Sequence, residues 1–401
     1  MDSNYSSSYL NSSTEYKWYF LQITAIFVTL LSIFFAKHEI LPFTYYTVPD
    51  SVYYEQWVFN PREKGFGTGF LHINTFLYSI GPQTFVFYNT ALLLASIYFC
   101  NIFESFSSKA VSWARASIVF NPYLLISVIG PTKEINLIFF SLFAFYLFQK
   151  KSFVLKLLSV GPILGAMAIR PEFGLIIFMA FIASLGLYYI KRPTWICLMI
   201  LLVFFLINTV PSINTVISNS GGENLEFFST SNYYQVALIL KAMQENPILQ
   251  VPAIAIKAVL VMFAPIVRAN NLFSPFIPLL DWGYTFMAYI SFPINLSFLL
   301  LFIYQKSSDS TRLSKSGQLF VIYAFLGILS TIATPIIQAR YLFPYAPFMA
   351  ACFMLHNLKL RNRILGFSFF IIAVTFVATA VFFPRVWDRY THEPMVYLSW
   401  I

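Results

Sequence analysis

Residues 128–140 read VIGPTKEINLIFF, and they place two charges, Lys133 and Glu134, in the middle of apolar sequence. The flanking stretches are apolar enough to form helices that face lipid. A charge beside the hydrocarbon core of a membrane is costly, so it usually faces the interior of a helix bundle or an aqueous cavity. The fold therefore depends on how many such helices the chain holds and on which side this pair of charges lies.

The composition excludes an ordinary soluble domain. Of the 401 residues, 58% are hydrophobic and only 10% are charged, whereas about a quarter of the residues of soluble domains are charged. Apolar stretches of roughly 17–25 residues, the length that crosses a bilayer as a helix, recur along the whole chain. We therefore expect an all-α polytopic membrane protein that forms a single integral-membrane domain over residues 1–401.

The recurring stretches predict about eleven transmembrane helices, with amphipathic or re-entrant helices at the outer face. The predicted spans are residues 18–36, 84–103, 112–130, 135–149, 154–170, 173–190, 194–211, 282–304, 318–337, 342–357 and 364–383. Segment 253–267 is too short to span and carries Lys257 near its centre, so it is predicted to be re-entrant or interfacial.

The charges predict the topology. With a cytoplasmic N-terminus, more than half of the 25 Lys and Arg residues fall in short inner loops and most of the 16 Asp and Glu residues fall outside. This distribution follows the positive-inside rule, and it predicts a multi-pass membrane protein whose C-terminus lies on the outer side. Residues 37–83 and 212–281 form the long outer loops, and residues 305–317 form a cytoplasmic loop. Because the inner loops are short and merely basic, we expect any chemistry at the outer face.

Three separate segments each bring a cation to the same outer level. Their residues are Lys133 and Glu134, Arg170 and Glu172, and Arg340 and Tyr341, and Arg268 in the second outer loop joins them. Together these cations can bind a phosphate or diphosphate, because a guanidinium binds phosphate oxygens bidentately. The alternative is that the acid and base of each turn pair locally, or that the long side chains reach to the membrane interface.

The first outer loop carries the candidate catalytic acids. Asp50, within YYTVPDSVYYEQW, can take a proton from a sugar hydroxyl as a general base, and the aromatic neighbours can stack on sugars. The alternative is that Asp50 caps a short interfacial helix and that the tyrosines form an aromatic belt. Glu55 is the second candidate, although on a helix it would lie about 140° from Asp50.

Other functional classes find little support. The three cysteines and four histidines show neither a disulfide pattern nor a metal-ligand spacing. The net charge of +9 reports topology in a membrane protein, so we expect no nucleic-acid partner. We also expect no cofactor and no divalent metal.

The order of the motifs resembles a known group. The segments PDSVYY, GPQTFVFYNTALLLASIYF, NPYLLISVIGPTKEINLIFFSLFAFYLF, AMAIRPEFGLIIF and QARYLFPYAPFMAA follow one another over roughly residues 20–355. This order resembles the GT-C superfamily of integral-membrane glycosyltransferases and the related O-antigen or capsule polymerases of the Wzy type. The resemblance implies an outer-face site for polyprenyl-(di)phosphate-linked sugar donors.

The resemblance also implies roles for single residues. Asp50 matches the catalytic acid of the first outer loop, and Lys133, Arg170 and Arg340 match the cations that bind the lipid phosphate. The chain departs from many members of the group because Asp50 has no adjacent acid. That departure argues against a bound divalent metal.

These observations predict an inner-membrane glycosyltransferase that polymerises repeat units of O-antigen, capsule or exopolysaccharide. Its partners would be the lipid-linked glycan, membrane lipids and a chain-length co-polymerase. One alternative is a GT-C transferase that moves a single sugar from a polyprenyl-phosphate donor to a lipid, glycan or protein. The others are a lipid-linked glycan flippase or transporter and a non-catalytic scaffold. A transporter is less favoured, because the two halves show no repeat and the charges collect at one face.

Overall fold

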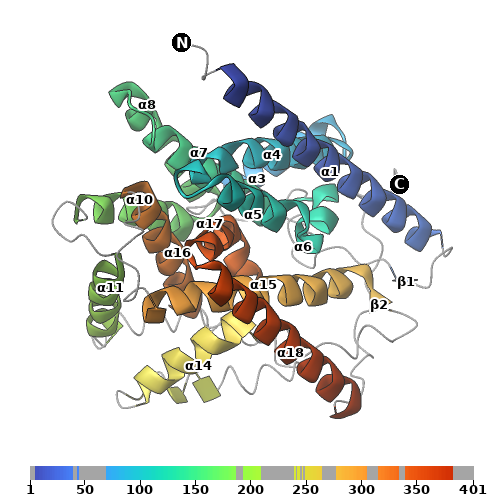
Figure 1. Ribbon diagram of the computed structural model, residues 1–401. Coiled ribbons are helices and arrows are strands. Elements are labelled where there is room, and N and C mark those ends of the chain that lie inside the picture. Colours follow the sequence, from blue (N-terminus) through green and yellow to red (C-terminus); the bar gives the residue numbers. More distant parts are fainter. Residues whose placement is uncertain are drawn as a thin grey trace.

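The computed structural model describes residues 5–38, 43–44, 69–186, 193–208, 239–240, 242–243, 246, 249–263, 277–304, 315–333 and 339–382. Almost all of them are helical, which confirms the predicted all-α class (Figure 1). One short exception pairs β1 (Phe43–Thr44) in parallel with β2 (Ile277–Pro278). This pairing joins the two segments that were predicted as long outer loops.

The first half of the chain forms a run of closely spaced helices. They are α1 (Tyr5–Lys37), α3 (Gly69–Ile80), α4 (Thr84–Phe99), η1 (Cys100–Ser105), α5 (Ser108–Val119), α6 (Pro122–Ile126), η2 (Ser127–Ile129), α7 (Lys133–Phe148), α8 (Phe153–Leu158), α9 (Val160–Ile169) and α10 (Pro171–Gly186). Helix α7 packs against α4 on one side and α9 on the other.

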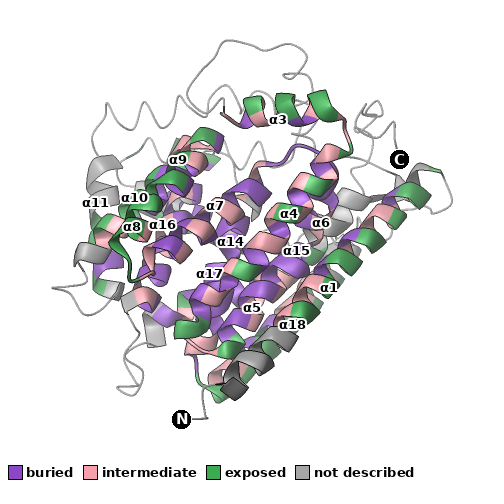
Figure 2. Cartoon of the chain, turned by 90° about the horizontal axis from the view of Figure 1, so that it is seen from above, coloured by how far each residue is buried: buried purple, intermediate pink, exposed green. Residues whose placement is uncertain are grey.

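The second half adds further helices to the bundle. They are α11 (Pro193–Asn208), α14 (Gln250–Phe263), α15 (Leu279–Tyr304), α16 (Lys315–Ala333), η4 (Ala339–Tyr345), α17 (Ala346–Cys352), η5 (Phe353–Leu355) and α18 (Leu358–Phe382). Helix α17 packs on α5, and α16 packs on α10. Figure 2 shows α3 lying across one end of the bundle, which we call the α3 end.

Local sequence explains where the helices break. Pro122 starts a new helix after α5, and the Asn121 side chain caps it by accepting a hydrogen bond from Leu124 N at 3.2 Å. The axis bends by 48° at this point. Gly81, between α3 and α4, has φ +148°, a conformation that side chains strongly disfavour.

The described part of the chain holds fewer long apolar helices than predicted. Two of them, Glu15–Phe35 and Thr84–Ser105, are long and apolar enough to cross a membrane, and the bent pair Ser108–Val119 with Pro122–Ile129 makes a third if it counts as one span. The shorter apolar stretches of 10–17 described residues are Phe153–Ile169, Pro171–Ala183, Ile290–Leu301, Ser316–Thr331 and Tyr341–Leu355, whereas a perpendicular span needs about 20 residues. Eleven spans are therefore not confirmed. Helix α14 has 14 residues, in keeping with the prediction that this segment is too short to span.

Polar and apolar residues are distributed unusually for a soluble protein. Buried residues concentrate on the central helices α5, α7 and α17, whereas α1 and α10 expose much of their surface (Figure 2). The buried set includes the polar side chains of Asn74, Asn89, Asn121, Glu134, Asn136 and Ser141. The exposed set includes Phe27, Phe178, Leu202, Phe369 and Phe370. A broad apolar surface of this kind is typical of a face that contacts lipid or a partner.

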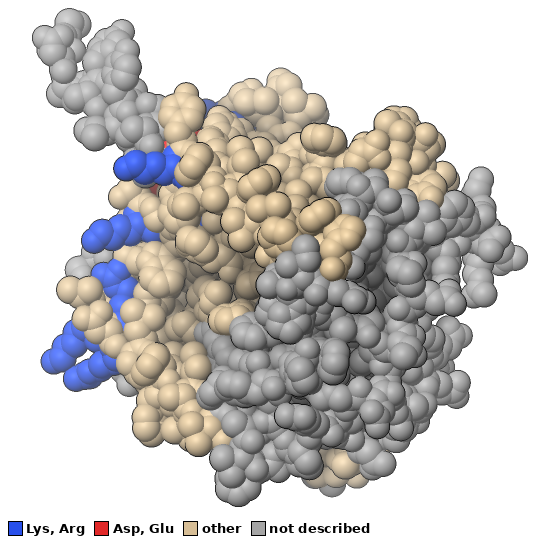
Figure 3. Space-filling model, turned by 90° about the vertical axis from the view of Figure 1, so that its right-hand side faces the viewer, with Lys and Arg blue, Asp and Glu red and all other residues tan. Residues whose placement is uncertain are grey.

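Basic side chains gather away from α3. The exposed basic residues of the described helices and links include Lys17, Lys109, Lys151, Lys156, Lys359 and Arg363. Figure 3 shows Lys and Arg gathered along one edge of the face in view. We call this the basic end of the bundle.

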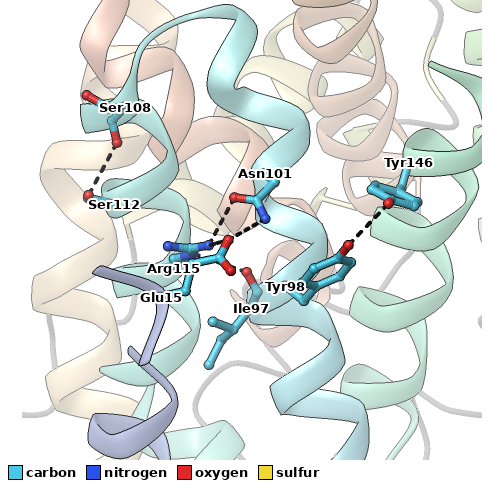
Figure 4. Close-up of polar contacts among 8 residues, drawn as sticks. All are labelled: Glu15, Ile97, Tyr98, Asn101, Ser108, Ser112, Arg115 and Tyr146. Atoms are coloured by element: carbon cyan, nitrogen blue, oxygen red, sulfur yellow. Dashed lines mark hydrogen bonds and ion pairs between the residues drawn. The ribbon is translucent and has the colours of Figure 1, made fainter. Parts of the chain in front are cut away.

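A buried ion pair fastens α1 to the bundle near the basic end (Figure 4). The Arg115 side chain is only 3% exposed. Its Nη2 donates to Glu15 Oε1 and to Asn101 Oδ1, both at 3.0 Å, and its Nε donates to the Ile97 carbonyl at 3.1 Å. Asn101 Nδ2 also donates to Glu15 Oε1, at 2.7 Å. One carboxylate thus joins α1, η1 and α5.

We expect Glu15→Met to lower the free energy of unfolding by about 1–3 kcal/mol, because the buried Arg115 and Asn101 donors lose their acceptor. The measurement is the unfolding midpoint of the purified protein in detergent. Glu104→Met is the control, since Glu104 is exposed and should leave the midpoint unchanged. Equal midpoints for both variants would contradict a stabilising role for the network.

Gly174 lets α10 approach α9 closely. A Cβ at this position would lie 1.9 Å from Met167 Cγ and 2.8 Å from the Ile163 carbonyl oxygen. We expect Gly174→Ala to destabilise the protein by about 1–3 kcal/mol through overpacking. Gly366→Ala is the matched control, because no atom lies within 4 Å of its added Cβ. It should be neutral or stabilising, since alanine favours helix. The same thermal melts test both, and destabilisation by Gly366→Ala alone would refute the packing argument.

Candidate functional site

The first part of the site is the start of α7. Thr132 has extended backbone angles, φ −140° and ψ 134°, and α7 begins at Lys133, two residues before the predicted start of this span. Glu134 is 8% exposed and accepts a hydrogen bond from Thr132 Oγ1 at 3.0 Å. An acid in the first turn also interacts favourably with the helix dipole. Lys133 Nζ lies 5.4 Å from the ring centroid of Phe70 on α3.

Helix α4 fixes the link that leads into α7. Asn89 Nδ2 donates to the carbonyls of Val128 and Gly130, each at 2.9 Å. Asn136 Nδ2 donates to the Thr132 carbonyl at 2.8 Å, and the Tyr88 hydroxyl donates to Asn136 Oδ1. These side chains satisfy polar groups that neither helix can pair, so they determine where the charged residues of α7 begin.

The second part of the site is the junction of α9 and α10. Arg170 is extended, φ −155° and ψ 106°, as expected for a residue before proline, and Pro171 opens α10. The Arg170 N–H donates to the Ala166 carbonyl at 2.8 Å. Arg170 Nε forms an ion pair with Glu172 Oε1. The junction therefore holds the backbone of Arg170 while its side chain reaches the bundle surface.

The third part is η4, which brings Tyr341 to the same place. The guanidinium carbon of Arg170 lies 4.4 Å from the ring centroid of Tyr341 and 5.4 Å from that of Phe173. A guanidinium over an aromatic face is attracted by the ring quadrupole. Glu134 lies close enough to Arg170 to interact with it electrostatically, and α7 packs directly on η4.

The three predicted segments thus converge at the α3 end. The structure brings Arg170 into contact with Glu172 and Tyr341, with Glu134 near enough to act on Arg170, and it places Lys133 against Phe70 of α3. It also contains the local Arg170–Glu172 pair that was the alternative prediction. Arg170 therefore lies in the predicted cluster and is also paired with the acid of its own turn, Glu172.

The remaining predicted residues are not described. Asp50, Glu55 and Arg268 lie outside the described residues. Arg340 lies in η4, but its side chain also falls outside them. The catalytic roles of Asp50 and Glu55 remain predictions.

Chemically, the cluster combines cations, carboxylates and an aromatic face. The Arg170 side chain is 20% exposed and that of Glu172 is 49% exposed, so a ligand can reach them. No residue in the described part accepts a hydrogen bond from Nη1 or Nη2 of Arg170. A phosphate can bind a guanidinium in a bidentate manner through Nη1 and Nη2 or through Nε and one Nη, and Glu172 occupies the second of these edges. Tyr341 offers a ring on which a sugar can stack.

Sequence reasoning missed the residues that support the site. They are Phe70, Tyr88, Asn89, Asn136 and Phe173. An asparagine inside an apolar helix was the available signal, because such polar groups usually face the bundle interior. In the described ranges no group of three His, Cys, Asp or Glu side chains could hold a metal ion.

Comparisons with protein-family models, with curated proteins and with solved structures found no match to this chain.

We expect Asn89→Leu to lower the free energy of unfolding by about 1–3 kcal/mol, because the carbonyls of Val128 and Gly130 lose their shared donor. Hydrogen exchange measured by mass spectrometry should also rise at the start of α7. Thr75→Ala on the exposed face of α3 is the control. Unchanged exchange and an unchanged melting midpoint in Asn89→Leu would show that the link does not depend on this amide.

Proposed function

We propose that this protein is a membrane-embedded glycosyltransferase that uses polyprenyl-(di)phosphate-linked sugars at the outer face of a bacterial inner membrane. The observation that supports it most is that Arg170, at the α9–α10 junction, meets Tyr341 of η4, while α7, which begins at Lys133, packs on η4. A lipid-linked phosphate arrives at the depth of the headgroups, where such cations can bind it.

The position of the exposed charges supports the orientation in this proposal. Exposed Lys and Arg residues lie at the basic end, which faces the cytoplasm if the positive-inside rule holds. The α3 end then faces the periplasm, with the N-terminus inside and the C-terminus outside. Exposed Phe, Leu and Ile side chains on the outer helices are suited to lipid contact. In this proposal about eleven segments of the chain lie in the membrane, and some of them are bent or too short to cross it alone.

The proposed step is a displacement at the anomeric carbon of the donor sugar. The acceptor hydroxyl oxygen forms the new bond to this carbon and gives its proton to the carboxylate of Asp50. The bond from the anomeric carbon to the phosphate oxygen breaks, and its electron pair leaves with the lipid phosphate. Arg170 and Lys133 stabilise the charge that develops on that phosphate.

The resemblance to Wzy-type enzymes favours polymerisation of repeat units, with a chain-length co-polymerase as a partner. Transfer of a single sugar uses the same chemistry and is the second candidate. The convergence of cations supports both candidates more than a scaffold, because a scaffold gives those cations no ligand. No cofactor and no metal takes part in the proposed step.

The test is complementation of a strain that lacks the gene, with surface glycan separated by size on a gel. We expect the wild type and Lys156→Gln, at the basic end, to restore a ladder of long chains. Arg170→Gln should reduce the long chains by about 10²-fold, because a charge-stabilising donor is lost from the transition state.

Protein levels and melting midpoints must match for all the variants compared. A full ladder from Arg170→Gln would exclude the site from the reaction. A ladder that persists without the gene, with every band shifted by one sugar, would instead establish transfer of a single sugar.

A further inference from the structure

The Arg170–Glu172 ion pair sits inside the site that is proposed to bind the lipid phosphate. Glu172 Oε1 accepts from the same guanidinium that would have to hold the anionic ligand. A carboxylate and a phosphate oxygen are both acceptors for that group. Each of them therefore weakens the hold of the other on Arg170.

We propose that Glu172 is an internal competitor for Arg170, so that the anionic ligand and Glu172 exchange on one guanidinium. The inference rests on the proposed function. Its ligand class is a phosphate or diphosphate carried on a prenyl chain. Glu172 thereby sets how tightly the site holds this anion.

Arg170 does not depend on Glu172 for its position. Its backbone is fixed by the bond from its N–H to Ala166 and by the bond that its carbonyl accepts from Phe173 N at 3.0 Å. Its guanidinium rests 4.4 Å from the ring centroid of Tyr341. A purely positioning carboxylate would be redundant in these surroundings.

Glu172 is also free to leave the pair at little cost. About half of its side chain is exposed, so the carboxylate can turn into solvent and be hydrated there. Water around this exposed carboxylate screens its attraction to Arg170, and holding the two side chains together costs entropy, so the pair is weak on the Glu172 side. Glu134, by contrast, is buried and hydrogen-bonded to Thr132, so it stays near Arg170 when Glu172 leaves.

The exchange has a consequence for turnover. When the bond between sugar and phosphate breaks, the phosphate gains a negative charge, and the product then binds the cations more strongly than the donor did. Glu172 limits this increase in affinity, because its carboxylate re-forms the ion pair with Arg170 and displaces the product phosphate. Release of an anionic product limits the rate of many enzymes, so a competing carboxylate at this point favours turnover.

The experiment measures binding of farnesyl phosphate to the purified full chain in nanodiscs of zwitterionic lipid. We expect Glu172→Gln to lower the dissociation constant about two- to fivefold, which corresponds to the strength of an exposed pair. Arg170→Gln should raise it about 10- to 100-fold, because hydrogen bonds between charged groups are lost. Glu104→Gln, an exposed acid in η1 away from the site, should leave it unchanged.

A double variant separates competition from a general effect of charge. In an Arg170→Gln background, adding Glu172→Gln should bring no further gain, because the guanidinium for which Glu172 competes is gone. A gain that persists there would overturn the proposal and point to simple repulsion between Glu172 and the ligand. A gain in affinity cannot result from misfolding, so the sign of the Glu172→Gln effect is itself informative.

The outcomes distinguish the two proposals. Suppose that Arg170→Gln weakens the binding of farnesyl phosphate, and that Glu172→Gln binds it no more tightly than the wild type does. Glu172 then positions Arg170, and this inference fails while the proposed site stands. If Arg170→Gln has no effect on binding, both the site and the inference fail.

Discussion

The two hydrogen bonds that Asn89 donates are the interactions on which the candidate site depends most. They hold the carbonyls of Val128, in η2, and of Gly130, in the short link between η2 and α7. That stretch decides where α7 begins, and so where Lys133 and Glu134 stand. Inside an apolar bundle no water can replace a lost hydrogen-bond donor to these carbonyls. The single amide of Asn89 therefore has a large effect on the stability of this link.

The same constraint explains the distribution of polar groups over the bundle. Buried polar side chains such as Asn89, Asn136 and Ser141 pair with other side chains or with the backbone, whereas exposed phenylalanine and leucine side chains cover the outer helices. The Arg115–Glu15–Asn101 network follows this rule near the basic end. At the α3 end the rule is relaxed, because Arg170 and Glu172 reach the surface.

Sequence reasoning predicted the helical class and the segments that form the site, because apolar length and isolated charges are local signals. It identified Arg170 and Tyr341 from separate turns, and the structure places the guanidinium of Arg170 over the ring of Tyr341. It did not predict the bend at Asn121 or the short helices, because capping and tertiary packing override apolar length. It also missed Asn89 and Phe70, since their roles depend on contacts between segments far apart in the sequence.

The central claim is that the α3 end binds a prenyl-linked phosphate. The most direct measurement is photo-crosslinking of a prenyl phosphate that carries a photoreactive group near the phosphate, with the labelled peptides mapped by mass spectrometry. The account predicts labels at the start of α7, at the α9–α10 junction and in η4, and their loss when unlabelled farnesyl phosphate is added in excess. Labels spread along the lipid-facing sides of α1 and α18, unaffected by that competitor, would contradict it.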